Sequence, residues 1–353
     1  MTIKDQVLKK VPEVISPVYL VGGAVRDILL GFTPKDWDFC TPLSPEEIEK
    51  AVRNAGRKPF CVGKRFGTIG FKVPIEHTDL EVDWEHVEVT TFRNEVYTEG
   101  SRKPEVNFVK DITADLSRRD FTINAMALKG RGKLIDPFFG LLDLNNKIIR
   151  AVGKPTHRFK EDPLRMLRAG RFASQLGFKI DEDIKKAVLA LNYKILEVSR
   201  ERWVQELDKI LMTDKPSIAF DFFMETRLMN FMIPELALQY KYDQKSVYHD
   251  LTLWEHTKKA MDATPKDINL RWAILLHDIG KPFVRTDKYS EGIWIKANYI
   301  KHDMVGAEIV LKLARYLKWS NDRTMTVENL VRNHLDDNSP LREYDKMGKG
   351  KDE

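Results

Sequence analysis

The stretch "YLVGGAVRDILLGFTPKDWDFCT", residues 19–41, decides the fold of the first part of the chain. Three largely apolar residues lead into the pair Gly22 and Gly23, and apolar residues then recur at helical spacing until another glycine ends the run. The segment "DWDFCT", residues 36–41, alternates polar and apolar residues as a strand does. The stretch therefore predicts a strand, a glycine turn, a helix and a second strand.

Asp36 and Asp38 stand two residues apart in the second of these strands. Side chains at this spacing project from the same face, about 7 Å apart along the strand, and Trp37 points to the opposite face. Two carboxylates so close repel each other unless a cation lies between them. Mg²⁺ takes oxygen ligands and bridges phosphates, so the pair is predicted to be catalytic and to bind this metal.

Upstream of the carboxylates, Gly22 and Gly23 let the backbone approach a ligand where a helix begins. The free N–H groups of a helix N-terminus favour phosphate, and Arg26 on the first turn can bind the same group. A phosphate-binding turn followed by metal-binding carboxylates suits nucleotidyl transfer. Either motif alone is more often an ordinary turn or a polar strand end; the ordered combination favours the functional interpretation.

The composition is that of an ordinary globular protein, and it excludes few classes of function. In 353 residues, 42% are hydrophobic and 31% charged, and the net charge of +5 permits a polyanionic partner. Cys40 and Cys61 form neither a disulfide framework nor a CxxC motif, which favours a reducing, cytoplasmic location. We expect no signal peptide and no membrane association, because no window approaches the roughly 20 apolar residues of a span.

The pattern of periodicities predicts an α+β protein in three regions. Residues 1–150 mix strand-like and helix-like segments, which indicates a head with a mixed β-sheet. Residues 151–240 show helical spacing throughout and predict an all-α neck and body. Residues 241–353 form a further helical region, which holds most of the histidines and ends in a charge-mixed segment, 341–353, expected to be flexible.

Five motifs resemble the class II tRNA nucleotidyltransferase and bacterial poly(A) polymerase family. In order they are "LVGGAVRDILLG…KDWDF", "EVTTFR", "DLSRRDFTINAMAL", "IDPFFGLLDL" and "EDPLRMLRAGRFASQLGF", and they span residues 18–180. The resemblance implies a nucleotidyltransferase head followed by helical neck, body and tail regions.

The resemblance also implies roles for individual residues of the head. Gly23 and Arg26 contact the incoming nucleotide, with Gly22 as a weaker candidate, and Asp36 and Asp38 hold the metal ions. Glu88 of "EVTTFR" is a candidate third metal ligand. The family assigns the stretch holding Arg118, Arg119 and Asp120 to triphosphate and ribose contacts, and Arg119 is the strongest candidate of the three.

The motif "EDPLRMLRAGRF" suggests how a protein could select C and A. Asp162 and Arg165 stand three apart, so on a helix an acceptor lies beside a set of donors. Cytosine and adenine present an amino donor next to a ring-nitrogen acceptor, whereas uracil and guanine present the reverse. The pair fits C and A and leaves polar groups unpaired against U and G. In the family this motif replaces a template; Arg168 and Arg171 add charge toward the triphosphate or hold the pair. An amphipathic helix with a basic face is the alternative.

The histidine-rich region resembles the HD domain of metal-dependent phosphohydrolases in "YHDLTLWEHT", "LLHDIGKP" and "HDMVGAE". Imidazoles and a carboxylate on neighbouring helices suit a second divalent metal. None of Asp303, Asp336 and Asp337 matches the position of the last acidic ligand, so a helical module without catalysis is an equal alternative. The candidate ligands are His256, His277, Asp278 and His302.

Together these features predict an enzyme that adds CCA to tRNA 3′ ends from CTP and ATP with Mg²⁺. A poly(A) polymerase, or an enzyme that adds only CC or only A, is the alternative within the same chemistry. An HD phosphohydrolase with a nucleotide-sensing head, and an RNA-binding module with an inactive head, are alternatives from other classes. The oligomeric state stays open.

Overall fold

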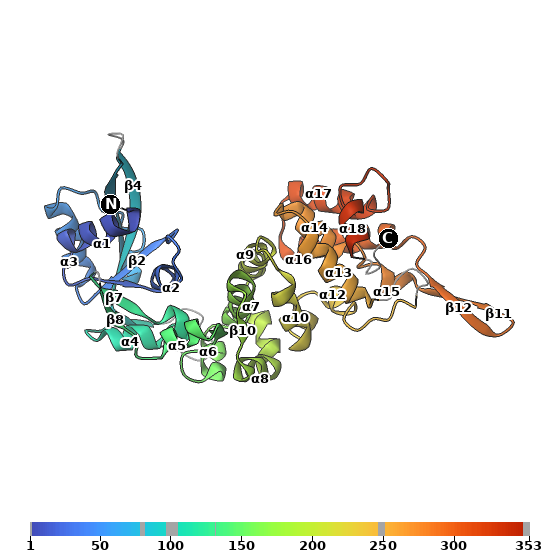
Figure 1. The fold of residues 1–353 in the computed structure, drawn as a ribbon, viewed down its shortest axis with the longest axis horizontal. Coiled ribbons are helices and arrows are strands. Elements are labelled where there is room, and N and C mark those ends of the chain that lie inside the picture. The colour runs from blue at the N-terminus through green and yellow to red at the C-terminus, as the bar shows by residue number, and fades with distance from the viewer. Residues whose placement is uncertain (1, 78–81, 97–104, 131, 246–250, 349–353) are drawn as a thin grey trace. The chain divides into compact units, whose positions relative to one another are not determined.

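The structure is a computed structural model that describes residues 2–77, 82–96, 105–130, 132–245 and 251–348. The chain divides into two compact units, Met1–Glu161 (unit 1) and Asp162–Glu353 (unit 2), and each is described by itself (Figure 1). No helix in these described parts of the chain has both the length and the apolar character that a membrane span needs.

Unit 1 is built on a six-stranded mixed sheet, as the sequence predicts, in the order β3-β4-β2-β1-β7-β8. Neighbouring strands are antiparallel except β2 and β4, which run parallel. The strands are β1 (Tyr19–Val21), β2 (Trp37–Thr41), β3 (Thr68–Glu76), β4 (Val82–Thr91), β7 (Ala127–Lys129) and β8 (Lys133–Ile135). A separate hairpin joins β5 (Arg93–Val96) to β6 (Glu105–Phe108).

The opening stretch folds as its pattern predicts. Strand β1 leads through Gly22 into helix α2 (Gly23–Leu29), and the chain returns as β2 between β1 and β4. Along β2 the buried Trp37 and Phe39 alternate with Asp38, whose side chain is exposed. This alternation puts Asp38 on the face of the sheet opposite the one that Trp37 occupies.

Helices cover the sheet of unit 1 and position its polar groups. Helices α1 (Ile3–Val14) and α3 (Pro45–Asn54) pack on β3. Helix α4 (Ile112–Ser117) packs Leu116 into a core cluster with Cys40 and Val21. Because Cys40 and Asp38 are two apart on β2, α4 lies on the face from which Asp38 projects. The remaining elements are η1 (Lys64–Phe66), η2 (Thr122–Asn124), α5 (Gly140–Asn145), β9 (Ile148–Ile149) and α6 (Pro155–Glu161).

Unit 2 is helical, as predicted, apart from strand β10 (Lys179–Ile180) and one hairpin. Its first helices are α7 (Leu164–Leu176), α8 (Glu182–Leu191), η3 (Asn192–Glu197), α9 (Arg200–Leu211), α10 (Ser217–Glu225), α11 (Met229–Met232) and α12 (Pro234–Ala237). Then follow α13 (Leu253–Ala263), α14 (Ile268–Leu276), α15 (Lys281–Val284), α16 (His302–Leu317), α17 (Asn321–Arg332) and α18 (Arg342–Met347).

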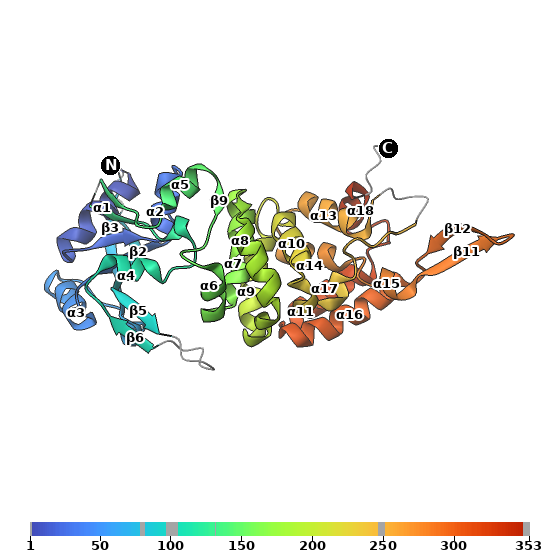
Figure 2. The ribbon, with the colours of Figure 1, turned by 90° about the horizontal axis from the view of Figure 1, so that it is seen from below.

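Two features of unit 2 differ from the sequence-based expectation. A hairpin of β11 (Thr286–Ser290) and β12 (Ile293–Asn298) interrupts the helical region, and Figures 1 and 2 show it extending beyond the helices of its unit. The expected flexible end is wrong for α18, because this helix packs on α13 and buries Asp345. Residues 349–353 of that segment lie outside the described residues.

Candidate active site and metal centre

Asp38 and Glu88 are direct register partners on the parallel strands β2 and β4, and both side chains are exposed. Asp36 lies just before β2. Desolvation by the surrounding protein, and then the negative charges of Glu88 and Asp36, raise the pKa of Asp38, whereas Arg119 lowers it. Asp38 and Glu88 thus share one face of the sheet, here called the acidic face, and the charge of Asp36 also acts on Asp38. These carboxylates are a donor set that fits a divalent cation.

The three carboxylates do not form a closed cage. Among the described residues, the ligand atoms of Asp36, Asp38 and Glu88 do not all lie within 4.8 Å of one another. Asp38 and Glu88 lie side by side on neighbouring strands, and a cation held by so open an arrangement needs further ligands, such as waters or the oxygens of a bound molecule. Mg²⁺ characteristically keeps such ligands beside one or two carboxylates.

The glycine turn is connected to the acidic face through Arg119. Gly22 has φ +70°, and a Cβ atom there would approach Nη1 of Arg119 to 2.8 Å. Arg26 is buried on α2, where its guanidinium donates to Oδ1 of Asn124 at 2.9 Å and to Oδ1 of Asp27 at 2.7 Å. Arg26 is thus held in a fixed orientation. The guanidinium of Arg119 lies next to the glycine turn, and its positive charge acts on Asp38.

Arg118 and Arg119 are at the C-terminal end of α4, where one buried carboxylate holds both. Asp115 accepts Arg118 Nη2 at 2.8 Å and Arg119 Nη2 at 3.3 Å. Burial acts to raise the pKa of Asp115, but the charges of the two guanidinium groups outweigh it and hold that pKa below its ordinary value of 3.8. Asp115, which the sequence analysis did not select, orients the predicted phosphate-binding arginines.

Asp120 and Asn124 connect the arginine motif to the glycine turn. The carboxylate of Asp120 is buried and accepts the backbone N–H of Phe121 at 2.8 Å and Nδ2 of Asn124 at 3.2 Å. Asn124 in turn accepts from Arg26, so a single amide links two residues 94 positions apart in sequence. The sequence analysis missed Asn124, although it lies inside the quoted motif "RRDFTINAMAL".

In unit 2, Arg165 lies on the first turn of α7, whereas Asp162 precedes the helix, so the two residues do not share a helix face as their spacing predicted. Asp162 accepts Leu164 N–H at 3.1 Å through Oδ1, and accepts Arg202 Nη2 at 2.9 Å through Oδ2. Arg165 is buried on the first turn. Arg202, a residue of α9 that the sequence analysis did not select, fixes the orientation of the Asp162 carboxylate.

Arg168 and Arg171 gather around one aromatic ring. Their guanidinium carbons lie 5.3 and 4.2 Å from the ring centroid of Phe172. Arg171 Nε also pairs with Glu206 Oε2 of α9 at 2.7 Å, and both side chains of this ion pair are largely buried. The ion pair connects α7 to α9, the helix whose Arg202 holds Asp162.

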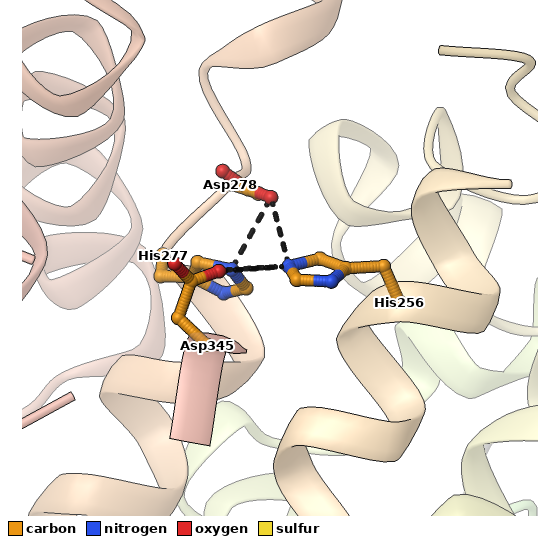
Figure 3. A group of neighbouring side chains, drawn as sticks. All are labelled: His256, His277, Asp278 and Asp345. Atoms are coloured by element: carbon orange, nitrogen blue, oxygen red, sulfur yellow. Dashed lines mark hydrogen bonds and ion pairs between the residues drawn. The ribbon is translucent and has the colours of Figure 1, made fainter. Parts of the chain in front are cut away.

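A second cluster, the HD cluster, lies in the interior of unit 2. His256 of α13, His277, Asp278 and Asp345 of α18 converge with their ligand atoms within 4.8 Å of one another (Figure 3). Nε2 of His256 lies 3.0 Å from Oδ1 of Asp345 and 3.3 Å from Oδ2 of Asp278. Nε2 of His277 lies 3.2 Å from the same Asp278 oxygen. All four residues are buried.

Asp278 also belongs to a second group, with His302 of α16 and His334, whose ligand atoms again lie within 4.8 Å. Oδ1 of Asp278 lies 3.2 Å from Nε2 of His302 and 3.8 Å from Nε2 of His334. Lys281 Nζ lies 2.7 Å from Oδ2 of Asp278. One carboxylate therefore stands between two sets of imidazoles.

The imidazole orientations fit a metal. Nδ1 of His277, His302 and His334 faces a backbone carbonyl at 2.7, 2.7 and 2.6 Å, so Nδ1 carries the proton and donates it. The Nε2 atoms of His302 and His334 then face each other at 3.1 Å. Two nitrogen lone pairs at this distance repel unless a proton or a cation lies between them, which fits a divalent metal.

The pKa values of two histidines in the cluster are shifted in opposite directions. Burial acts to lower the pKa of His277, but the charge of Asp278 and hydrogen bonds to Asp278 and Asp345 raise it to about 10. Burial and the positive charge of His277 lower the pKa of His334 to about 4. Because metal ligands must be deprotonated, metal binding at this cluster would release a proton from His277.

The candidate ligands His256, His277, Asp278 and His302 all lie in the HD cluster, together with two residues that the sequence analysis did not assign. His334 was visible in the histidine-rich region, whereas Asp345 lies in a segment expected to be flexible and carries no local signal. Among the described residues, the metal-binding groups do not include Asp303, Asp336 or Asp337.

Three family models match the chain in order. They describe a "Poly A polymerase head domain" over residues 18–150, a "Probable RNA and SrmB- binding site of polymerase A" over 177–239, and an "HD domain" over 247–349. The chain belongs to the family of class II tRNA nucleotidyltransferases and bacterial poly(A) polymerases. The resemblance inferred from its motifs is thereby confirmed.

Curated relatives of the chain include CCA-adding enzymes. The enzyme of Pediococcus pentosaceus is 38% identical over 269 residues, covering 74% of this chain and 65% of its own length. The enzyme of Streptococcus uberis is 40% identical over 227 residues, covering 64% of this chain and 53% of its own length. The chain thus spans between half and two thirds of the length of these relatives.

Solved structures of the family share the fold. The Bacillus stearothermophilus CCA-adding enzyme in complex with CTP aligns with a TM-score of 0.61 and 26% identity, covering 99% of this chain and 82% of that one. A tRNA nucleotidyltransferase complexed with a primer tRNA and an incoming ATP analog aligns with a TM-score of 0.51 and 27% identity, covering 90% and 78%. The predicted α+β head with helical body and HD-like domain is confirmed.

Proposed function

We propose that the chain is a CCA-adding tRNA nucleotidyltransferase, which extends a tRNA 3′ end with CTP and ATP and releases pyrophosphate. The observation that carries the proposal is the acidic face of Asp38 and Glu88 beside Arg119 and the glycine turn. Structures of similar enzymes with CTP and with a primer tRNA support the choice of substrates. A cytoplasmic location belongs to the same proposal, since both cysteines are free thiols.

Asp36 and Asp38 would hold Mg²⁺, with Glu88 as a third acidic group. When bound, this metal lowers the pKa of the attacking 3′-hydroxyl and neutralises charge on the triphosphate. Desolvation, and then the negative charges of Glu88 and Asp36, raise the pKa of Asp38, which supports the assignment because a bound cation would relieve this repulsion. The protein's part is to keep these carboxylates on one sheet face while Trp37 anchors the strand in the core.

Gly23 and Arg26, with Gly22, would cradle the triphosphate through backbone N–H groups and a fixed guanidinium. Arg119 stands between this turn and Asp38, so it would bind a phosphate oxygen and stabilise charge that develops there. Arg118, which pairs with the same Asp115 carboxylate, would add a second positive charge near the phosphates.

Asp120 is the family's candidate for the ribose hydroxyls. Its carboxylate accepts the backbone N–H of Phe121 and Nδ2 of Asn124, which hold it in a fixed orientation beside Arg119 in the chain, and a carboxylate is the right chemical type to accept from hydroxyl groups.

Asp162 and Arg165 would read the base, with Arg168 and Arg171 in support. Arg202 leaves Asp162 with a fixed carboxylate plane, which a specific hydrogen-bond acceptor needs. The Arg171–Glu206 ion pair supports the interpretation that Arg171 holds the reading pair in place. In this proposal residues 1–150 are the catalytic head, 151–240 the base-reading and RNA-binding body, and 241–353 the HD-like region.

The test offers a tRNA transcript lacking its last three nucleotides together with each nucleoside triphosphate. We expect additions that stop after C, C and A. Asp36→Ala with Asp38→Ala should lower incorporation on the order of 10³-fold, whereas Asp83→Ala, an exposed acid on the same sheet, serves as the matched control. An open-ended A tail would instead establish a poly(A) polymerase, and addition of C alone or A alone a partial enzyme.

The HD cluster supports a second candidate function, a metal-dependent phosphohydrolase in unit 2. The acidic ligand that the sequence did not show is supplied by Asp345, and His334 adds a further imidazole. Because Asp278 stands between two imidazole groups, the cluster would hold one or two divalent metals. A metal bound there supplies an activated water and binds phosphate oxygens. The alternative is a helical module without catalysis, which would show no metal-dependent hydrolysis.

Metal binding can be measured apart from activity. The parent for this test carries Asp36→Ala with Asp38→Ala, which removes the proposed metal ligands of the head. It should bind Mn²⁺ or Zn²⁺ stoichiometrically and unfold at a higher temperature with the metal than without it. Adding Asp278→Ala should abolish both effects, and adding Asp303→Ala should leave both intact. Equal metal content in parent and Asp278→Ala would contradict a metal site at this cluster.

A further inference from the structure

The β11–β12 hairpin is a feature of unit 2 that the proposed function does not use. It lies between Lys281 and His302 in sequence, and it extends beyond the helices of its unit (Figure 2). Every residue of β11 is exposed. A two-stranded hairpin in water is only marginally stable by itself, so an extended one needs internal support or a partner.

Internal support exists on one face of the hairpin. Tyr289 and Trp294 are register partners, and indole Nε1 of Trp294 donates to Asp287 at 3.3 Å. Asp287 also pairs with Arg285 Nη2 at 3.0 Å, and Lys245 Nζ lies 5.7 Å from the Trp294 ring centroid. The acid on this face is therefore already neutralised by a neighbouring cation.

An unfavourable pair lies next along the ladder, beyond an irregularity in the register between Lys288 and Tyr289. Lys288 lies directly opposite Lys296 in the antiparallel register, and like charges in this position destabilise a hairpin. Among the described residues neither lysine makes an ion pair. The only other acidic residue of the hairpin is Glu291 at the turn. The two lysines therefore present an uncompensated positive charge on a projecting element, which an anionic partner would relieve.

We propose that the Lys288–Lys296 face of this hairpin contacts the phosphate backbone of the RNA substrate. The inference rests on the proposed function, which makes a tRNA the substrate. Two lysines at register partners span neighbouring phosphates of one strand, and such contacts add affinity that depends on salt but not on sequence. The alternative role for lysines on a bare strand is to prevent edge-to-edge association, and any charged side chain fills that role.

Charge reversal separates the two roles, because glutamate protects an edge as well as lysine but repels phosphate. In the full-length chain, Lys288→Glu with Lys296→Glu should raise the KM for a tRNA lacking its last three nucleotides about tenfold. The KM for CTP should stay within twofold. The slope of log binding constant against log salt should become shallower by between one and two, since each lost phosphate contact removes about 0.7 to 0.9.

Two matched variants serve as controls. Lys259→Glu with Lys312→Glu changes two exposed lysines on helices α13 and α16 by the same charge, and it should leave the KM for tRNA within twofold. Lys288→Arg with Lys296→Arg keeps the charge and should restore parent affinity. A 4-thiouridine-substituted tRNA should also form ultraviolet cross-links to residues 286–298 of the unmodified chain.

The outcomes distinguish this inference from the function on which it rests. If the parent adds C, C and A while the hairpin variant matches the helix control in KM and salt slope, the hairpin does not bind RNA. The same conclusion follows if no cross-link maps to the hairpin, or if charge reversal changes the oligomeric state and not the RNA affinity. If the parent incorporates no nucleotide, the proposed function itself fails.

Discussion

At the scale of single residues, the head depends on polar side chains that other side chains hold in place. Asp115 is nearly inaccessible to solvent and pairs with both Arg118 and Arg119. Its carboxylate also accepts the backbone N–H of Arg93 at 3.2 Å. A buried carboxylate with this many donors stabilises the fold and also fixes the orientation of both arginines near the acidic face.

Asp115→Asn should destabilise the chain by about 2 kcal/mol at pH 7, since it leaves buried donors with a weaker acceptor. Chemical denaturation with a probe for unit 1 measures the change. The exposed Asp183, which pairs with Lys186 on the surface, provides the control. Its change to Asn should cost under about 0.5 kcal/mol.

The pH dependence of this difference follows from the sign of the shift. The folded pKa of Asp115 is below its ordinary value of 3.8, so the stabilisation is fully present above pH 3.8. It is lost as the pH falls through the folded pKa. The difference between parent and Asp115→Asn should stay constant from pH 7 to 5 and shrink below about 3.8. A difference that grows on acidification would contradict this assignment.

At the scale of elements, the HD cluster requires a close crossing of backbones. A Cβ atom on Gly280 would lie 2.1 Å from the carbonyl oxygen of His302 and 2.7 Å from the amide nitrogen of Gly306. Only a residue without a side chain lets the start of α16 come this near to the segment after Asp278. The glycine of "HDIGKP" thus positions His302 against Asp278.

Gly280→Ala should therefore separate α16 from Asp278 and lower the affinity for Mn²⁺ at least tenfold, with a loss of stability of about 2 kcal/mol or more. Isothermal titration with the metal and thermal unfolding measure the two effects. Gly132→Ala is the matched control, because a Cβ there meets no atom within 4 Å. Equal metal affinity in the two variants would show that the crossing does not position the ligand.

At the scale of the whole molecule, two compact units carry separate groups of functional side chains. The acidic face of Asp38 and Glu88 lies entirely in unit 1, and the HD cluster lies entirely in unit 2. Each has its own core, so a change in the side chains of one should not disturb the other.

A crossed experiment on the full chain checks this independence. Asp278→Ala should remove metal-dependent hydrolysis of bis-p-nitrophenyl phosphate and leave incorporation of CTP and ATP within twofold. Asp36→Ala with Asp38→Ala should have the opposite effect. If Asp278→Ala also lowered nucleotide incorporation tenfold while unit 1 stayed folded, the two groups would be coupled.

Local pattern predicts most of the head, and the reason is geometric. A strand of period two puts Asp38 opposite Trp37, and a glycine turn ends β1, so the residues of "LVGGAVRDILLG…KDWDF" carry their own geometry. Residues that act through distant partners show no such pattern. Asn124 and Arg202 lie 98 and 40 positions from the side chains they orient, and their roles are visible only in the fold.

The amino-acid order by itself determined the α+β class of the head, the helical body and the residues of both candidate sites that stand at regular spacing, because periodicity and spacing act within one element. Tertiary structure alone decided that Glu88 lies beside Asp38, that Asp115 holds both arginines, and that Asp345 completes the HD cluster. These contacts depend on which strands pair and which helices pack together, and burial of the whole core selects that arrangement.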